Sequence, residues 1–354
     1  MTLFAVARCR PRLVFLTRQL TIQAHQRSGL RVGAALLTAF ACTASAYLFL
    51  PSTQSRAAPE QLSVQHFTPS TVIASEDASQ DTKLITLRVN PALIPTRLLR
   101  HSVSASRIYS VFVKDSDIQV ERPYTPLECA DMEGRMKFWV KKYEKGEVGR
   151  WLHARKVGDV VELRGPELTW DWSWRPSDDE WDEVVMISGG TGITPFYQFL
   201  HSIFAYPSKD KRLTRYTLLH GSRTPADLPP PAILDPLTQF ASERPDIFKM
   251  HFFVDSMSTG STHAVAYPSS LEVGRIGRAA IERGLGPSSD NRSWWSSLWK
   301  KREETLQKRI LFLVCGPEPM INAISGPYGR NFSQGSVGGI LGEMGYTSRE
   351  VWKL

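Results

Sequence analysis

Short runs of alternating apolar and polar residues occupy the chain from about residue 60 to about residue 175. Residues 82–89 alternate most regularly, and residues 109–113 and 136–141 are further runs rich in β-branched and aromatic residues. Such alternation is typical of strands with one buried face, and turn residues bound each run. Because no long helical pattern separates them, these runs predict a small antiparallel barrel.

Farther along the chain, the apolar runs become continuous, at residues 182–188, 215–220, 248–254 and 309–315. Continuous runs predict strands that are buried on both faces, and segments of helix length separate these runs. Residues 195–205 carry a helical pattern directly after a glycine cluster. We therefore expect a barrel domain at residues 65–178 and an α/β domain with a parallel sheet at residues 179–354.

The N-terminal part has a different composition. Residues 1–28 mix apolar residues with Arg, Ser, Thr and Gln and contain no acid, which is typical of a mitochondrial targeting segment. Residues 30–50 predict a transmembrane anchor, since the uncharged run 32–50 would span about 28 Å as a helix. Residues 51–64 form an expected linker, and similar tether-like composition continues to about residue 80.

The membrane assignment has one alternative, a leader that is cleaved to release a soluble domain. If the anchor is retained, its Arg-rich side would stay in the matrix. The folded part would then face the intermembrane space from the mitochondrial inner membrane.

Charge and cysteine content exclude several classes of function. The net charge is +8, but seven arginines precede the first acidic residue, Glu60, which leaves about +1 for the rest. The folded part therefore gives no electrostatic reason to expect nucleic-acid binding. The four cysteines and eight histidines show no metal-ligand spacing, so we predict no metal site.

The glycine cluster after the run 182–188 is the first candidate binding site. Glycines let backbone N–H groups approach an anion, and the following helix N-terminus adds its positive dipole end. The alternative is a tight turn without a ligand. Asp227 follows the next predicted strand, where a carboxylate would meet adenosine ribose hydroxyls and repel an additional phosphate, so NADH is favoured over NADPH. The alternative for Asp227 is a solvated loop residue or a capping residue. The candidate pyrophosphate-binding residues are Gly189, Gly190, Thr191, Gly192, Thr194 and Pro195.

A second candidate lies at the end of the last continuous run, where Cys315, Gly316 and Pro317 are followed by Met320. Ligands of open α/β sheets bind at the carboxyl ends of strands, so the Cys315 thiol would line a nicotinamide pocket without acting as a nucleophile. The alternative is a buried core cysteine. Two glycine-bearing strand ends in one domain favour a dinucleotide.

The predicted barrel contains a third candidate, Arg122-Pro123-Tyr124-Thr125. A flavin dinucleotide needs a cation for its pyrophosphate, an aromatic plane and a hydroxyl near its redox edge, and this segment contains all three. The alternative is an ordinary strand that ends at Pro126.

These segments resemble the ferredoxin-reductase-like superfamily, and within it the NADH–cytochrome b5 reductase family. Residues 122–125 resemble its flavin motif, and residues 146–152, with Gly146, Val148 and Gly149, resemble its second flavin segment. Residues 164–166 resemble the end of its barrel. The resemblance implies a six-stranded FAD barrel, an α/β domain for NAD(P)H, and hydride transfer to the flavin beside Thr125 and Cys315.

The chain also departs from that family. Gly149 stands where Ser or Thr is usual, residues 274–309 form a Trp-rich insert with Trp294, Trp295 and Trp299, and residues 325–339 are glycine-rich. The C-terminus, at residues 351–354, lacks the usual paired Phe. These features resemble fungal inner-membrane flavoproteins that support haem attachment to cytochrome c. The expected partner is therefore a haem protein or the cytochrome c maturation machinery.

Two clusters of residues allow competing interpretations. We expect Trp170, Trp172, Trp174 and Trp181 to fill an interdomain seam rather than to form a haem-facing surface. Lys141 and Lys142 are expected at a solvated strand edge rather than near the flavin. The predicted function is an FAD-dependent oxidoreductase that accepts hydride from NAD(P)H; the alternative is a mitochondrial assembly factor that uses the fold without turnover.

Overall fold

The computed structural model describes residues 61–96, 107–117, 119–172, 181–205, 214–257, 271–286 and 308–354. The expected targeting segment at residues 1–28 and the expected anchor at residues 30–50 lie outside the described residues. Among the residues that are described, no helix is long and apolar enough to cross a membrane.

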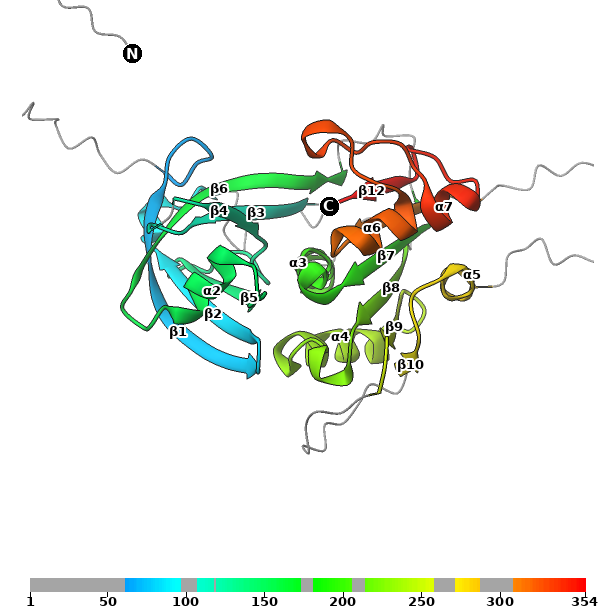
Figure 1. Ribbon diagram of the computed structural model, residues 1–354, viewed down its shortest axis with the longest axis horizontal. Helices are drawn as coiled ribbons and strands as arrows, with labels where there is room; N and C mark the ends of the chain where they lie inside the picture. The colour runs from blue at the N-terminus through cyan, green and yellow to red at the C-terminus, as the bar shows by residue number, and fades with distance from the viewer. Residues whose placement is uncertain are drawn as a thin grey trace, which may run out of the picture. The chain divides into compact units, whose positions relative to one another are not determined.

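The first domain is built on a six-stranded antiparallel sheet, as predicted (Figure 1). Its strands follow the order β4-β3-β6-β1-β2-β5. The backbone N–H of Leu127, just after β4, donates to the carbonyl of Lys137 on β5 at 2.8 Å, so the two edges of the sheet are linked. The short helix α2 (Glu147–Ala154) follows β5. The strands are β1 (Thr68–Ser79), β2 (Thr82–Val89), β3 (Arg107–Lys114), β4 (Glu121–Tyr124), β5 (Arg135–Lys141) and β6 (Val160–Asp171).

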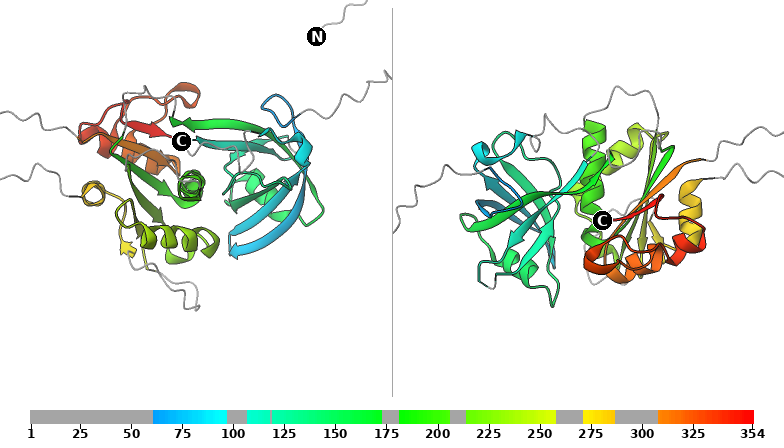
Figure 2. Two further views of the ribbon diagram at one scale, coloured as in Figure 1. Left: turned by 180° about the vertical axis from the view of Figure 1, so that it is seen from behind. Right: turned by 90° about the horizontal axis from the view of Figure 1, so that it is seen from above.

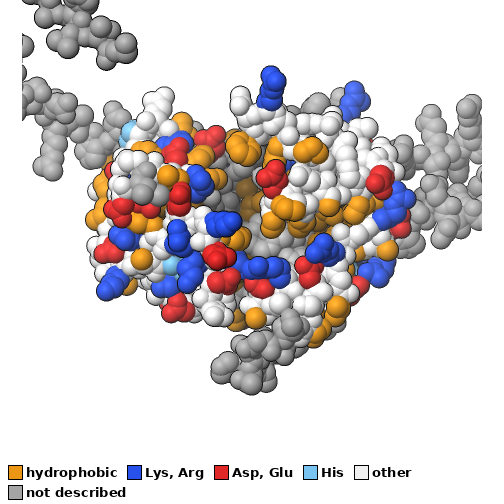
Figure 3. All heavy atoms as spheres, in the orientation of Figure 1, with side chains coloured by type: hydrophobic (Ala, Val, Ile, Leu, Met, Phe, Trp, Pro, Cys, Tyr) orange, Lys and Arg blue, Asp and Glu red, His pale blue; other side chains and the backbone are white. Residues whose placement is uncertain are grey.

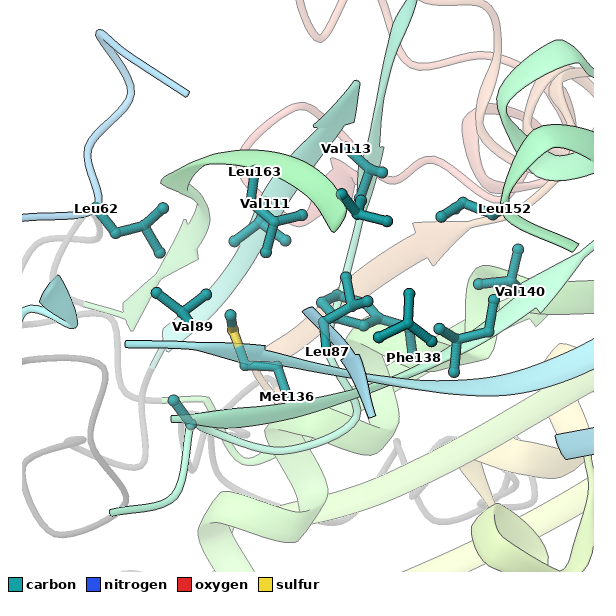
Figure 4. Close-up of a cluster of buried hydrophobic side chains, with 14 of the residues drawn as sticks. Leu62, Leu87, Val89, Val111, Val113, Met136, Phe138, Val140, Leu152 and Leu163 are labelled. Atoms are coloured by element: carbon teal, nitrogen blue, oxygen red, sulfur yellow. The ribbon is translucent and has the colours of Figure 1, made fainter. Parts of the chain in front are cut away.

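The inward faces of these strands form one apolar core. In Figure 4, labelled side chains from β2, β3, β5, β6 and α2 point toward one another. Leu62 joins this core with 1% of its surface exposed, although the sequence placed it in the linker. The tether-like composition up to residue 80 was also misleading, because residues 68–79 form β1, which pairs with both β2 and β6. The folded domain therefore begins before residue 65.

The second domain contains a six-stranded parallel sheet in the order β10-β9-β8-β7-β11-β12, which confirms the predicted α/β architecture. The chain runs outward from β7 to β10 and then returns to the other side of β7. Neighbouring connections therefore diverge between β7 and β11, and such a point is where open α/β sheets bind ligands. The strands are β7 (Glu183–Gly189), β8 (Arg215–Ser222), β9 (Phe248–Val254), β10 (Leu271–Val273), β11 (Ile310–Cys315) and β12 (Val351–Lys353).

Helices cover both faces of this sheet (Figures 1 and 2). The helices α3 (Thr194–Ala205) and α4 (Pro231–Glu243) pack on one face, and α5 (Arg278–Leu285), α6 (Glu318–Ser325) and α7 (Gly339–Glu343) pack on the other. Helix α5 lies within the segment expected as an insert, and its buried Ile281 makes it part of the α/β fold. Trp294, Trp295 and Trp299 lie outside the described residues.

Helix α3 lies between the barrel and the parallel sheet (Figure 2). Its Phe196 and Leu200 share one apolar cluster with Ile108 and Trp139 of the barrel. Burial of this cluster removes large aromatic surfaces from water, which favours a fixed arrangement of the two domains.

The tryptophans at the end of β6 and after it contribute to the same cluster, which confirms the seam interpretation for three of them. Trp170 is fully buried, Trp181 is 7% exposed, and Trp172 stacks on Phe199 with ring centroids 6.2 Å apart. Trp352 of β12 meets Trp170 edge to face at 5.3 Å. Trp174 lies outside the described residues.

Charged side chains of both signs are interspersed on the face seen in Figure 3. On the barrel, Arg135 pairs with Asp131 at 2.6 Å and with Glu133 at 3.0 Å. Exposed pairs of this kind typically contribute less than about 1 kcal/mol each. Their main effect is to reduce the net field over this part of the surface.

Candidate active site

The carboxyl ends of β7 and β11 meet at the divergence point of the parallel sheet. Ser188 pairs with Cys315 in register, and the two following loops are in backbone contact. A Cβ atom at Gly192 would lie 2.5 Å from the Cys315 carbonyl oxygen, and one at Gly316 would lie 3.0 Å from the Gly189 nitrogen. Only glycine allows this approach, so the structure brings together the two strand ends singled out in the sequence.

The loop after β7 has the geometry of an anion cradle. Gly190 has a φ of +54°, which favours glycine, and no atom lies within 4 Å of the position where its Cβ would stand. A 3₁₀ turn at Gly190–Ile193 continues directly into α3, and the Thr194 hydroxyl donates to the Thr191 carbonyl at 3.0 Å. Pro195, in the first turn of α3, removes an N–H that has no helical acceptor there. The remaining N–H groups and the helix dipole suit a pyrophosphate.

The other side of this cradle consists of Cys315 and Met320. The Met320 sulfur packs so closely on Gly189 that a Cβ there would lie 2.6 Å away. Cys315 keeps some exposed surface, yet the protein around its thiol raises the thiol pKa to about 12 by desolvation. The thiol is therefore protonated at physiological pH. It can line a pocket, but it lacks the thiolate that a nucleophile requires.

In the barrel, β4 presents Arg122 at the surface. One guanidinium nitrogen donates to the backbone carbonyl of Glu121 at 2.8 Å. The Glu121 carboxylate is bound instead by Arg164, through two hydrogen bonds of 2.6 Å that lower its pKa. Arg164, from the segment that resembles the end of a flavin barrel, thus leaves the Arg122 charge available for an anion.

Tyr124 and Thr125 follow on the same strand and in the turn after it. Tyr124 packs partly against the barrel core, and burial raises the pKa of its phenol to about 12. The Thr125 hydroxyl lies 2.9 Å from the Ser110 hydroxyl on the neighbouring strand β3. The Tyr124 ring is therefore neutral, and a second hydroxyl holds the Thr125 side chain in place.

Helix α2 supplies the second candidate flavin contact. Gly146 is its N-cap, and the first N–H groups after it have no acceptor inside the helix. A Cβ atom at Gly149 would lie 2.8 Å from the Lys141 carbonyl oxygen. Glycine therefore lets α2 approach β5 closely, at the cost of the side-chain hydroxyl that relatives were expected to have. The Trp151 indole donates to Asp117 in the β3–β4 turn at 3.1 Å, which fixes α2 beside the other flavin segment.

Gln198 on α3 connects the two halves of the site, although it was not among the residues predicted from the sequence. Its side-chain carbonyl accepts from the Tyr109 N–H at 2.9 Å, and its amide donates to the Pro126 carbonyl at 2.8 Å. The residue is only 2% exposed. The helix that begins at the nucleotide loop is thereby bonded to the residue after Thr125. A polar residue inside an otherwise aromatic helix segment was the available signal.

Lys141 joins the domains at a second point, and the expectation of a solvated edge was wrong for it. Its ammonium group bonds to Asp227 at 2.6 Å and to Asp81 at 3.1 Å, with 7% of the side chain exposed. Lys142 is exposed, as expected. Lys141 is buried because the turn after β8 packs over the end of β5 and supplies a carboxylate.

Asp227 lies in the turn after β8, as the sequence predicted. Burial alone would raise the pKa of its carboxyl, but hydrogen bonds from Lys141 and Thr224 and the nearby charge of Arg223 lower it below its usual range. The Thr224 hydroxyl donates to it at 2.8 Å. The carboxylate is therefore ionised and partly exposed, next to two cations.

These donors fit two dinucleotides. Arg122 and the N-terminus of α2 would hold the pyrophosphate of one, and the cradle between β7 and β11 would hold that of the other. This division is the arrangement of a two-domain oxidoreductase that binds a flavin in its barrel and a nicotinamide in its α/β domain.

Comparison with known proteins gives the same class. Residues 69–172 match the family model described as oxidoreductase FAD-binding domain, and residues 186–271 match oxidoreductase NAD-binding domain. NADH-cytochrome b5 reductase 2 of Scheffersomyces stipitis is 31% identical over 284 residues, covering 80% of this chain and 82% of that protein. The protein of the same name from Kluyveromyces lactis is also 31% identical, over 283 residues, with coverage of 80% and 82%.

Among solved structures, the cytochrome b5 reductase domain of Ulva prolifera nitrate reductase has the same fold, with a TM-score of 0.58. It is 22% identical, and the match covers 83% of this chain and all of that one. The chain belongs to the ferredoxin-reductase-like family of FAD- and NAD-binding oxidoreductases. Within it, the chain is a cytochrome b5 reductase-like, NAD(P)H-dependent FAD reductase and a distant relative of the fungal NADH-cytochrome b5 reductase 2 proteins.

Proposed function

We propose that this reductase takes hydride preferentially from NADH and passes electrons to a haem protein or to the cytochrome c maturation machinery. The observation that carries the proposal is the bond of Gln198 to the backbone beside Thr125, because it couples the nucleotide loop to the flavin segment. FAD, when bound, accepts two electrons as hydride and can release them one at a time. The protein's own contribution is to bind, orient and exclude water.

Each site residue has a proposed part in that arrangement. Arg122 and the α2 N–H groups bind the FAD pyrophosphate, and Tyr124 flanks the flavin. Thr125, fixed by Ser110, hydrogen-bonds near the redox edge. On the other side, Gly189–Thr194 would bind the NADH pyrophosphate, and Cys315 with Met320 would line the nicotinamide pocket. No side chain in this set needs to transfer a proton at neutral pH.

The acceptor and the location are proposed from the relatives and from the sequence. The relatives' name states that they act on cytochrome b5 with NADH, which supports a haem protein as acceptor. The departures at Gly149 and at the C-terminus favour a partner in cytochrome c maturation. The N-terminal composition supports anchoring in the mitochondrial inner membrane, with the catalytic part toward the intermembrane space.

Anaerobic absorbance of the purified full chain, loaded with FAD, tests the reaction directly. We expect NADH to bleach the visible flavin band, and added haem acceptor to restore it. If FAD binds but neither NADH nor NADPH reduces it, the assembly-factor alternative replaces the proposal. If no FAD binds, the assignment of the barrel residues is wrong.

Replacing Asp227 tests the preference for NADH. We expect Asp227→Ser to raise the ratio of kcat/KM for NADPH to that for NADH about tenfold, because a repelling charge disappears and the cations Lys141 and Arg223 remain. Steady-state kinetics with both nucleotides measure the ratio, which cancels any general loss from the broken Lys141 pair. Asp246→Ser, at an exposed ion pair elsewhere in the domain, is the control. An unchanged ratio, or a parent protein that already prefers NADPH, contradicts the assignment.

A further inference from the structure

A chain of hydrogen bonds runs through the buried end of β8. The Ser188 hydroxyl lies 2.8 Å from Nδ1 of His220, and Nε2 of His220 lies 3.1 Å from the Ser222 hydroxyl. The Ser222 hydroxyl in turn donates to the backbone carbonyl of Asp227 at 3.2 Å. Ser188 and His220 are fully buried, and Ser222 is 8% exposed.

The bonds in this chain have one consistent direction. Ser222 has a single hydroxyl hydrogen, which it gives to the Asp227 carbonyl, so its oxygen must accept from an N–H at Nε2 of His220. Nδ1 then carries the lone pair and accepts from the Ser188 hydroxyl. Burial lowers the pKa of His220 to about 3, so the ring is neutral, as this pattern requires.

The two ends of this hydrogen-bond chain lie at the two candidate nucleotide-binding segments. Ser188 immediately precedes Gly189, where the pyrophosphate cradle begins. The other end bonds to the backbone of Asp227, the proposed contact for the adenosine ribose. Between them, the His220 ring packs against Phe252 on the neighbouring strand β9, with ring centroids 5.8 Å apart and an angle of 70° between the ring planes.

We propose that His220 is a positioning residue that sets the place of the Asp227 turn relative to the pyrophosphate cradle. It thereby supports binding of the adenosine half of the nucleotide and leaves the nicotinamide half unaffected. The inference rests on the proposed assignment of Asp227 to the adenosine ribose. His220 itself touches neither nucleotide nor flavin; it acts through Ser188 and Ser222.

Two variants interrupt the hydrogen-bond chain through His220 in different ways. His220→Phe keeps the ring and removes both nitrogens, whereas Ser222→Ala removes only the bond to the Asp227 carbonyl and is the milder change if the first variant fails to fold. Thr217→Val is the matched control, because it removes an equally buried hydroxyl at the other end of β8. Asp227→Ala serves as the reference for loss of the adenosine contact.

The measurements separate the two halves of the nucleotide. Calorimetric titration of the FAD-loaded full chain with ADP-ribose reports the adenosine half, and flavin reduction by reduced nicotinamide mononucleotide reports the other. We expect His220→Phe and Ser222→Ala to weaken ADP-ribose binding roughly 3- to 10-fold, the effect of losing one positioning hydrogen bond. Reduction by the mononucleotide should change less than twofold, and Thr217→Val should match the parent in both measurements.

Three results overturn the inference. If Asp227→Ala weakens ADP-ribose binding but His220→Phe and Ser222→Ala do not, His220 has no positioning role and the Asp227 assignment stands. If the variants slow reduction by the mononucleotide as much as they weaken ADP-ribose binding, the effect is general destabilisation of the domain. If Asp227→Ala also leaves ADP-ribose binding unchanged, the Asp227 assignment fails and the inference fails with it.

Discussion

Replacing Arg122 with alanine is expected to weaken FAD binding about 100-fold, so that the variant is purified with little flavin. A guanidinium can donate two parallel hydrogen bonds to a phosphate, and charge-assisted bonds of this kind contribute about 1.5–3 kcal/mol each. Arg164 does not replace it, since its guanidinium is already bound to both carboxylate oxygens of Glu121. Flavin content of the purified variant, followed by titration of the flavin-free protein with FAD, measures the loss.

The matched control for this prediction is Arg135→Ala. Arg135 is another exposed barrel arginine, but it pairs with Asp131 and Glu133 and lies on β5 rather than in the flavin segment. We expect it to retain full FAD occupancy. Normal flavin content in Arg122→Ala would remove Arg122 from the flavin site, and flavin loss in both variants would point to destabilisation of the barrel.

The sequence predicted most strands well where their burial is simple. Residues 82–89 alternate because one face of β2 packs in the barrel core, and the strand in the structure has the same bounds. The run 248–254 likewise coincides with β9, because a parallel strand covered on both faces needs a continuous apolar run. In both cases local composition and tertiary environment agree, so the pattern alone is sufficient.

Strand β1 shows where that agreement ends. Its first inward residues include Thr68 and Ser70, which are buried yet polar, and its pairing with β2 shifts register between Val72 and Ala74 and again between Asp77 and Ser79. A bulge inserts a residue and breaks the period of two, so the alternation fades. The buried Ser70 hydroxyl donates a hydrogen bond to the Val161 carbonyl at 2.6 Å, and this acceptor lies 91 residues away in the sequence. Composition alone therefore indicated a tether.

The residues of the candidate site also fall into those that local sequence predicts and those that it does not. Gly189, Gly190 and Gly192 are recognisable in the sequence because the backbone conformation and the close approach of two loops require glycine at fixed spacing. Lys141, Gln198 and His220 carry no such local requirement. Each is buried and bonded to at least one partner on another element, and the same residue types on a surface would look identical in the sequence. The candidate binding residues were therefore visible in the sequence, whereas residues that position the candidate binding segments were not.

Gln198 is the positioning residue with the largest expected effect. Gln198→Leu preserves the approximate volume of the side chain but leaves the Tyr109 N–H and the Pro126 carbonyl without their partner. Each buried group that loses its hydrogen bond costs about 1–3 kcal/mol, so the contact between the domains should weaken by roughly 2–6 kcal/mol. The apolar cluster around Phe196 and Trp139 remains, and we expect the variant to fold and to bind FAD.

The consequence should appear in the reaction rather than in binding. Gln198 fixes the flavin segment relative to the helix that starts at the nucleotide cradle, and a misplacement of about 1 Å between reacting groups can slow a reaction about 100-fold. We therefore expect stopped-flow flavin reduction at saturating NADH to be about 100-fold slower in Gln198→Leu, with near-normal FAD content. Gln239→Leu, which removes an exposed side-chain amide of α4 that donates to Glu243 at 2.7 Å, should reduce its flavin at the parent rate. A parent-like rate in Gln198→Leu would mean that the apolar seam alone aligns the two domains, because the cluster around α3 is then sufficient without the hydrogen bonds.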